Sequence, residues 1–387
     1  MTLPALKQDL IDRWLTVYDE YELRKEMKDT SVKMVYAETI RFGLDKYTKE
    51  KFPAQGPLSA EERPEHSYAY GLDALGKPCF SMFEEQKNYY TYTDSLIEYV
   101  EYNQNSPIPS SLQRVIYEGD RKVGFQSIIL NDINTRQFAG MTGKPILTKL
   151  LKEASSVICI IESYDYKEDR IINADCLHIM PGVGEYSLRK KYNYNSTGEL
   201  EEIINVFGDK RTSYDYVKIP SNITLQQLSE QVSSLIAEDI IKTLADEDLK
   251  EPLGILEINY QEIGDYSPVL TIYSEKEQKK IEKSADRLTE LLANDERDYY
   301  IDLSANTHER LLVAFMQEVE ELEDFSLAES MIRKVACLLN ASKLNNEVTT
   351  GAKFMAYSVD WSIGPEDFST LLAECGLPEN IVKEWRS

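Results

Sequence analysis

The chain has 387 residues, of which 42% are hydrophobic and 28% are charged, a balance that excludes wholesale disorder and predicts two or three folded domains. Its net charge of −24 comes from 43 basic and 67 acidic residues, and it argues against nucleic-acid binding because phosphate recognition requires clustered lysine and arginine. The five cysteines are scattered without a Cys-x-x-Cys pair, so neither a disulfide framework nor a zinc site is expected.

The charge is unevenly distributed along the chain. Residues 221–387 hold 33 acids against 15 bases, a net of −18, whereas residues 1–220 hold 34 against 28. A field of this sign speeds association with a basic protein, and it also serves simply to keep a protein soluble. The first residues lack a basic segment followed by an apolar run, and no stretch of about 18 apolar residues occurs, so we expect a cytoplasmic protein with no membrane partner.

Residues 1–50 are predicted to be helical. Leu6, Leu10 and Trp14 repeat at the spacing of one buried helix face. A second helix is expected from Val32 to Tyr47. Three prolines and a glycine in residues 52–64 then predict an exposed loop or linker.

From Ser67 to Lys218 the sequence predicts antiparallel strands, because tyrosines two residues apart recur at Tyr68/Tyr70, Tyr90/Tyr92, Tyr164/Tyr166, Tyr192/Tyr194 and Tyr214/Tyr216. Side chains two residues apart on a strand lie on one face. The steps from 68 to 90 and from 192 to 214 are 22 residues, which fits a strand, a tight turn, a second strand and a return. A helix is predicted from Ile146 to Ala154, and the strands on either side of it form either one sheet or two.

Two segments resemble known bacterial families. Tyr192-Asn-Tyr194-Asn-Ser-Thr-Gly198-Glu-Leu200, followed by Gly208 and Tyr214-Asp-Tyr216, resembles the tyrosine–aspartate (YD/RHS-type) hairpin repeat of polymorphic-toxin shells and of some proteins encoded beside them. Asn195 and Glu199 stand where that repeat usually has Asp and Arg, so the resemblance implies the local hairpin and not the large closed shell. Phe354 to Asp360 resembles the closing segment of an uncharacterised domain found near toxin–immunity loci.

After Thr224 the pattern changes to mixed helices and strands. The expected elements, in chain order, are a helix over Leu225–Leu244, a hairpin of Gly254–Tyr260 and Pro268–Ser274, a helix over Glu275–Ala293, a helix containing Leu311 to Leu322, a helix over Leu327–Leu344, a strand over Lys353–Trp361 and a helix starting at Pro365. We therefore predict an α+β protein in three parts: an N-terminal helical segment (1–50), a tyrosine-rich antiparallel β domain (51–220) and an acidic α+β domain (221–387).

Few residues suggest chemistry, since the chain has only three histidines. Cys176 and His178 lie two residues apart in a predicted strand, so they are the candidate catalytic pair of a thiol hydrolase; the alternative is a buried thiol beside a strand-end histidine. His308 is expected near a helix start capped by Ser304, Asn306 or Thr307, and His66 is expected on a surface loop. No cofactor and no metal ligand set is expected.

The sequence therefore favours a non-enzymatic protein-interaction module. The expected partner-binding residues are tyrosines on an exposed sheet face together with an acidic helix: Tyr192, Tyr194, Tyr214, Tyr216, Glu318, Glu320, Glu321, Glu323 and Asp324. The two resemblances and the charge point to a bacterial immunity or antitoxin-like protein that binds and neutralises a toxin domain, and the acidic charge would suit a basic toxin domain. The alternatives are the Cys176/His178 hydrolase and a structural adaptor in a bacterial assembly.

Overall fold

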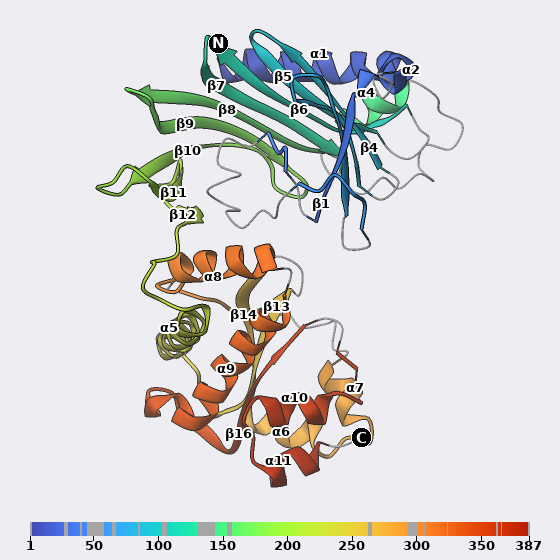
Figure 1. Cartoon of the computed structure of the whole chain (residues 1–387). Helices are drawn as coiled ribbons and strands as arrows, with labels where there is room; N and C mark the ends of the chain where they lie inside the picture. The colour runs from blue at the N-terminus through green and yellow to red at the C-terminus, as the bar shows by residue number, and fades with distance from the viewer. Residues whose placement is uncertain are drawn as a thin grey trace. The chain divides into compact units, whose positions relative to one another are not determined.

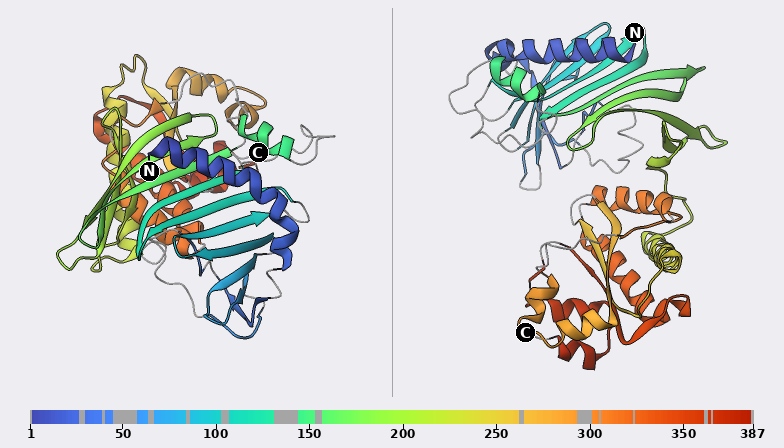
Figure 2. Two further views of the ribbon diagram at one scale, coloured as in Figure 1. Left: turned by 90° about the horizontal axis from the view of Figure 1, so that it is seen from above. Right: turned by 180° about the vertical axis from the view of Figure 1, so that it is seen from behind.

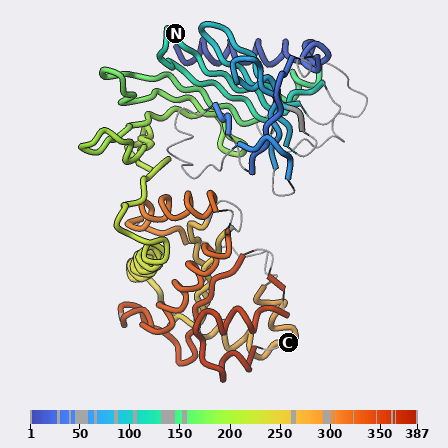
Figure 3. The backbone as a smooth tube through the Cα atoms, viewed as in Figure 1, coloured from blue at the N-terminus to red at the C-terminus, as the bar shows by residue number. Residues whose placement is uncertain are grey.

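The computed structural model describes residues 2–385, apart from 27–29, 39–40, 45–57, 64–66, 84–85, 103–106, 131–143, 153–156, 262–264, 293–300, 305, 323, 361–362 and 365. It divides the chain into two compact units, Met1–Tyr216 and Val217–Ser387, whose backbones are traced in Figure 3. The first two of the three predicted segments therefore lie in one compact unit. His66 and most of the proline-containing loop fall outside the described residues.

The first unit is built on one sheet whose twelve strands follow one another in chain order (Figure 1). The strands are β1 Lys33–Ala37, β2 Tyr68–Leu72, β3 Pro78–Phe83, β4 Gln86–Thr93, β5 Leu96–Tyr102, β6 Pro109–Glu118, β7 Arg121–Leu130, β8 Val157–Lys167, β9 Arg170–Met180, β10 Gly184–Tyr194, β11 Leu200–Phe207 and β12 Thr212–Val217. Every predicted tyrosine doublet lies within a strand, and the strands before and after the helix near residue 146 belong to the same sheet.

One face of this sheet is covered by helices α1 (Leu3–Val17) and α4 (Lys144–Lys152), and Figure 2 shows α1 lying across the strands. The predicted helix face is confirmed, because Leu6, Leu10 and Trp14 are buried in the core between α1 and the sheet. The short helices η1 (Tyr18–Glu20) and α2 (Tyr21–Glu26) follow α1. The helices and the sheet face they cover therefore make one continuous apolar core.

Buried ion pairs also hold α1 and α2 against the sheet. Glu98 on β5 accepts two hydrogen bonds from the guanidinium of Arg13 on α1, each at 2.7 Å, and also pairs with Arg24 on α2. Glu98 and Arg24 are both buried. An isolated charge at this depth would be costly, so the pairing fixes the two helices at one position on β5.

The predicted helix over Val32–Tyr47 is wrong in its first part. Residues Lys33–Ala37 form β1, which pairs antiparallel with β2. Val35 is β-branched and Tyr36 is aromatic, and both kinds of residue favour a pleated surface. Val35 and Ala37 are buried with the period of two that a strand requires. Part of the remaining stretch lies outside the described residues.

The second unit has a four-stranded sheet in the order β15-β14-β13-β16 within the described ranges. Strands β13 (Leu253–Gln261) and β14 (Asp265–Ser274) form the predicted hairpin, β15 (Ile301–Asp302) extends it, and β16 (Thr350–Val359) lies parallel to β13. Its helices are α5 Leu225–Asp246, α6 Glu275–Ile281, α7 Arg287–Leu292, α8 Glu309–Leu322, α9 Ser326–Ser342, α10 Phe368–Glu374 and α11 Glu379–Glu384, with a short η4 at Lys343–Asn346. The chain thus has the predicted α+β class.

Two predicted helix boundaries change in this unit. The helix expected over Glu275–Ala293 is divided into α6 and α7, because the Ser284 hydroxyl accepts a hydrogen bond from the Asp286 backbone and so competes with the helical pattern. The last predicted helix begins at Phe368, and Pro365 lies outside the described residues. No helix among the described residues is long and apolar enough to cross a membrane.

Candidate functional site

The predicted pair Cys176 and His178 lies on β9, on the sheet face away from α1. The neighbouring residue Leu177 points into the α1 core, and side chains alternate along a strand, so Cys176 and His178 share the opposite face. The antiparallel register places Glu162 of β8 directly opposite Cys176. Lys190 lies on β10, two pairs along from the Leu188 that faces Cys176.

The polar side chains on this face form a compact cluster. One ligand atom each from Glu162, Cys176 and His178 lies within 4.8 Å of the others. The Lys190 ammonium is 2.7 Å from Glu162 Oε1 and 3.3 Å from Asp215 Oδ2 on β12. Tyr164 donates a hydrogen bond of 2.9 Å to the second oxygen of Glu162. Both oxygens of this carboxylate are therefore held in place.

The imidazole of His178 has one partner within reach among the described residues. Its Nδ1 is 3.4 Å from the Tyr186 hydroxyl, a long hydrogen bond, and the two rings meet edge to face with centroids 5.4 Å apart. The other nitrogen, Nε2, is buried, and the described part of the chain offers it no hydrogen-bond partner. A buried imidazole nitrogen without a hydrogen-bond partner either destabilises the folded state or binds a ligand.

The protonation states follow from burial and from the neighbouring charges. Burial raises the pKa of the Cys176 thiol, and the Glu162 carboxylate raises it further. Burial lowers the pKa of His178. For Lys190, burial acts to lower the pKa, but the charges of Glu162 and Asp215 outweigh it, so the pKa is raised. At neutral pH the cluster therefore holds a thiol, a neutral imidazole and an ammonium.

This setting does not suit the predicted thiol hydrolase. A nucleophilic cysteine needs an exposed, electropositive environment that lowers its pKa. Cys176 is instead fully buried, lies opposite a carboxylate, and donates to the Ala174 carbonyl at a sulfur–oxygen distance of 3.6 Å. The structure favours the alternative of a buried thiol beside a histidine, and the nucleophile role for Cys176 and His178 has no support.

The prediction of an exposed tyrosine face is wrong for two of the four named rings. Tyr192 is 6% exposed and Tyr216 is 5% exposed, and both pack in a core cluster with Cys176 and neighbouring apolar residues. Tyr194 and Tyr214 are half-buried. Tyr194 donates to the Ile171 carbonyl at 2.9 Å, which fixes its ring against the sheet. The tyrosine doublets do lie in strands, as their spacing predicted, but the sheet face that they share is partly covered by other side chains.

The predicted acidic residues lie at the carboxyl end of α8. Glu320 and Asp324 are exposed, whereas Glu318 and Glu321 are half-buried, and Glu323 lies outside the described residues. Burial raises the pKa of Glu318, and the charge of Glu321 raises it further. Between these acids Leu322 leaves 53% of its surface exposed. This end of α8 therefore combines several acidic residues with one exposed apolar side chain.

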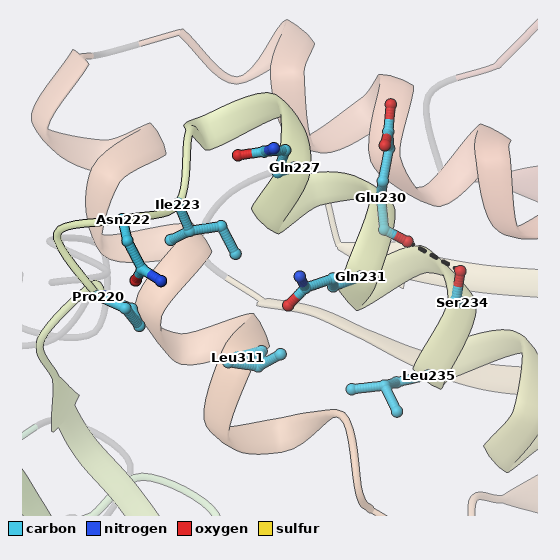
Figure 4. Close-up of a pocket in the computed structure, with 9 residues that line it drawn as sticks. All are labelled: Pro220, Asn222, Ile223, Gln227, Glu230, Gln231, Ser234, Leu235 and Leu311. Atoms are coloured by element: carbon cyan, nitrogen blue, oxygen red, sulfur yellow. Dashed lines mark hydrogen bonds between the residues drawn. The ribbon is translucent and has the colours of Figure 1, made fainter.

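A hollow of about 690 Å³ lies beside the first turns of α5, shown in Figure 4. Its lining is largely amide, hydroxyl and apolar: Pro220, Asn222, Ile223, Gln227, Glu230, Gln231, Ser234, Leu235 and Leu311. Ser234 is engaged with the Glu230 carbonyl of its own helix at 2.9 Å. Glu230 is the one ionisable group in this lining, so the hollow has no acid–base pair.

His308 is held by a residue that the sequence did not suggest. Asp239 of α5 accepts a hydrogen bond from the His308 backbone at 3.1 Å, and its Oδ2 is 2.7 Å from His308 Nδ1. The Thr307 hydroxyl donates to the other Asp239 oxygen at 2.9 Å. The residues before α8 are therefore held from α5, and the capping predicted for Ser304, Asn306 or Thr307 stays a prediction. Both partners are buried, which indicates a structural role.

Sequence reasoning missed Glu162, Lys190 and Asp215 because only the strand register brings them to Cys176. Lys190 stands in Arg-Lys-Lys, which looks like a solvated strand face, and Glu162 follows a run of apolar residues. Neither a family model nor a curated protein matches the sequence, so the function must be argued from this geometry.

Proposed function

We propose that this protein is a non-enzymatic interaction module, an immunity or antitoxin-like protein that binds and neutralises a basic toxin domain through the acidic second unit. The net charge of −18 over residues 221–387 supports a basic partner, because opposite charge raises the rate of encounter. The choice of a toxin rests on the hairpin resemblance and on the resemblance of residues 354–360 to a domain found near toxin–immunity loci.

The carrying observation is the crowding of acids at the carboxyl end of α8. Glu318 and Glu321 are three residues apart on one helix, a spacing at which like charges repel. Acids at a helix carboxyl end also oppose the helix dipole. Proteins keep such locally unfavourable arrangements mainly where function requires them. A lysine or arginine from a partner would relieve both effects.

Leu322 gives this surface the composition of an interface. Its exposed side chain lies in sequence between Glu321 and Asp324, and it is four residues after Glu318 on the same helix face, so this end of α8 presents an apolar side chain together with acids. Binding surfaces commonly combine an apolar centre with a polar rim. The partner that fits is a basic amphipathic segment, with an apolar residue over Leu322 and cations over the acids.

The proposal is tested with a synthetic amphipathic helical peptide that carries leucines on one face and lysines on the other. The full chain is compared with the triple variant Glu318→Gln, Glu320→Gln, Glu321→Gln. A matched control, Asp246→Asn, Glu247→Gln, Asp248→Asn, removes the same charge from an exposed site at the end of α5. Binding is followed by fluorescence anisotropy at low and high salt.

We expect the α8 variant to bind the peptide about tenfold more weakly, about 1.4 kcal/mol, and the α5 control to bind like the wild type. High salt should weaken wild-type binding and reduce the difference. Equal losses in both variants would mean that bulk charge alone attracts the peptide, and the proposed surface would be wrong. If the adjacent gene encodes a basic toxin domain, neutralisation is tested by co-expressing the two proteins and measuring growth.

A further inference from the structure

Three donor groups of the kinds that bind transition metals meet on β8 and β9. Glu162 and Cys176 are cross-strand partners, and His178 follows two residues later on the same face. Their ligand atoms all lie within 4.8 Å of one another. Ligand atoms on one tetrahedral ion with bonds of about 2.0–2.3 Å lie roughly 3.3–3.8 Å apart. Side-chain shifts on the order of 1 Å or less would therefore close the three groups around one ion.

A second observation is the orientation of the donors. Histidine ligands usually donate their other ring nitrogen to a neighbouring oxygen, which fixes the tautomer. Tyr186 offers such an oxygen to Nδ1 of His178. In the tautomer whose proton is on Nδ1, the other nitrogen Nε2 has a lone pair, and Nε2 is buried without a hydrogen-bond partner in the described ranges. The Glu162 carboxylate is likewise oriented by Tyr164 and Lys190. The supporting contacts of a metal site are thus in place.

We propose that Glu162, Cys176 and His178 bind one zinc ion. The donor set selects the metal: thiolate and imidazole favour zinc, the carboxylate disfavours Cu(I), and a single cysteine in the cluster cannot hold an iron–sulfur centre. Three protein ligands leave a fourth position for water. Binding replaces the thiol proton, which passes to solvent, with a sulfur–zinc bond.

The surrounding charges fit a divalent ion. Glu162 and Asp215 are two carboxylates against the single ammonium of Lys190, which leaves one net negative charge among these side chains. A divalent ion and a Cys176 thiolate together add one positive charge, so the group becomes neutral. The ion would then cross-link β8 and β9 beside the core cluster that contains Tyr192 and Tyr216.

The test uses Co²⁺ as a spectroscopic probe on the full chain, freed of metal by a chelator. A thiolate–cobalt bond gives a near-ultraviolet charge-transfer band that a carboxylate or imidazole does not give. We expect the wild-type band to saturate at one equivalent, and Zn²⁺ to abolish it by displacement. Absence of the band in the wild type overturns the proposal. This result does not depend on whether any variant folds.

Variants locate the ion. Cys176→Ser should lose the band, and His178→Asn should weaken Co²⁺ binding at least tenfold. The matched control is Cys159→Ser, a buried cysteine on β8 that faces the α1 core instead, and its band should equal that of the wild type. Circular dichroism checks that each variant is folded. A band of full strength in folded Cys176→Ser would place the metal on another thiol and overturn the assignment. Because this test involves no peptide, its outcome is independent of the interaction proposed for α8.

Discussion

Glu162 on β8 and Cys176 on β9 are direct cross-strand partners, and the carboxylate of Glu162 is 2.7 Å from the ammonium of Lys190 on the next strand. This relationship makes the cluster a charged group inside an otherwise apolar part of the first unit. Its stability depends on the ammonium, because Lys190 compensates two carboxylates at once.

Lys190→Met should therefore destabilise the first unit strongly. Glu162 would keep a buried charge without its cation, and breaking a buried pair in this way costs about 3–5 kcal/mol. The matched control is Arg189→Met, because Arg189 is the adjacent residue and pairs with Asp165 at 3.0 Å in an exposed position. An exposed pair contributes about 0–1 kcal/mol. Urea unfolding measures the free energy of unfolding of both variants, and equal decreases in the two would contradict the account.

The buried cluster around Glu98 should make the protein acid-sensitive. Burial acts to raise the pKa of Glu98, but the hydrogen bonds and charges of Arg13 and Arg24 outweigh it, and the pKa lies below its usual value of 4.5. A carboxyl group with a lowered folded pKa contributes stability that is present above the unfolded pKa and lost as the pH falls through the folded value. Stability should therefore decline below about pH 4.5.

The control for this prediction is Glu98→Gln, which cannot titrate at that position. Its free energy of unfolding should be lower at neutral pH and should depend less on pH in the acidic range. Measuring urea unfolding from neutral to acidic pH in both proteins isolates the contribution of Glu98. Parallel curves would show that other carboxyl groups control the acid response.

Whether α1 stabilises the sheet that it covers can be tested by comparing the same substitution, leucine to alanine, at a buried and at an exposed position. Leu10 is 0% exposed in the core beneath α1, whereas Leu23 on α2 is 66% exposed. Leu10→Ala should cost about 2–5 kcal/mol because it leaves a cavity. Leu23→Ala should change the free energy of unfolding by less than about 0.5 kcal/mol. A small loss at Leu10 would mean that α1 is not an essential part of this core.

The hairpin between β10 and β11 depends on Gly198. Its φ is +86°, and a Cβ atom there would clash with Nη2 of Arg170, whose guanidinium covers the Tyr194 ring. Gly198→Ala should cost about 1–2 kcal/mol from backbone strain. Gly208→Ala, where a Cβ meets nothing within 4 Å and no positive φ applies, is the control in thermal unfolding. Similar melting temperatures for the two variants would contradict this role.

The sequence predicted features that depend on neighbours along the chain. The tyrosine doublets marked strands because alternation is local, and the buried face of α1 was visible in the spacing of Leu6, Leu10 and Trp14. The contact that holds the residues before α8 could not be predicted in this way, because Asp239 lies 69 residues before His308 in the chain.

The candidate site was predicted only in part for the same reason. Cys176 and His178 were found from their spacing, but Glu162 joins them through the β8–β9 register. The burial of Tyr192 and Tyr216 depends on packing between strands, which a period of two does not reveal. The sequence therefore indicated which residues share a face, and packing decided whether that face is covered.

The most direct test of the central claim is to locate where a basic partner binds. Backbone hydrogen–deuterium exchange of the full chain is measured with and without the lysine–leucine peptide. The account predicts slowed exchange at the carboxyl end of α8, around Glu318 to Leu322, with no change at the acidic end of α5, residues 246–248. Protection at residues 246–248, or no protection at α8 when the peptide is bound, would contradict it.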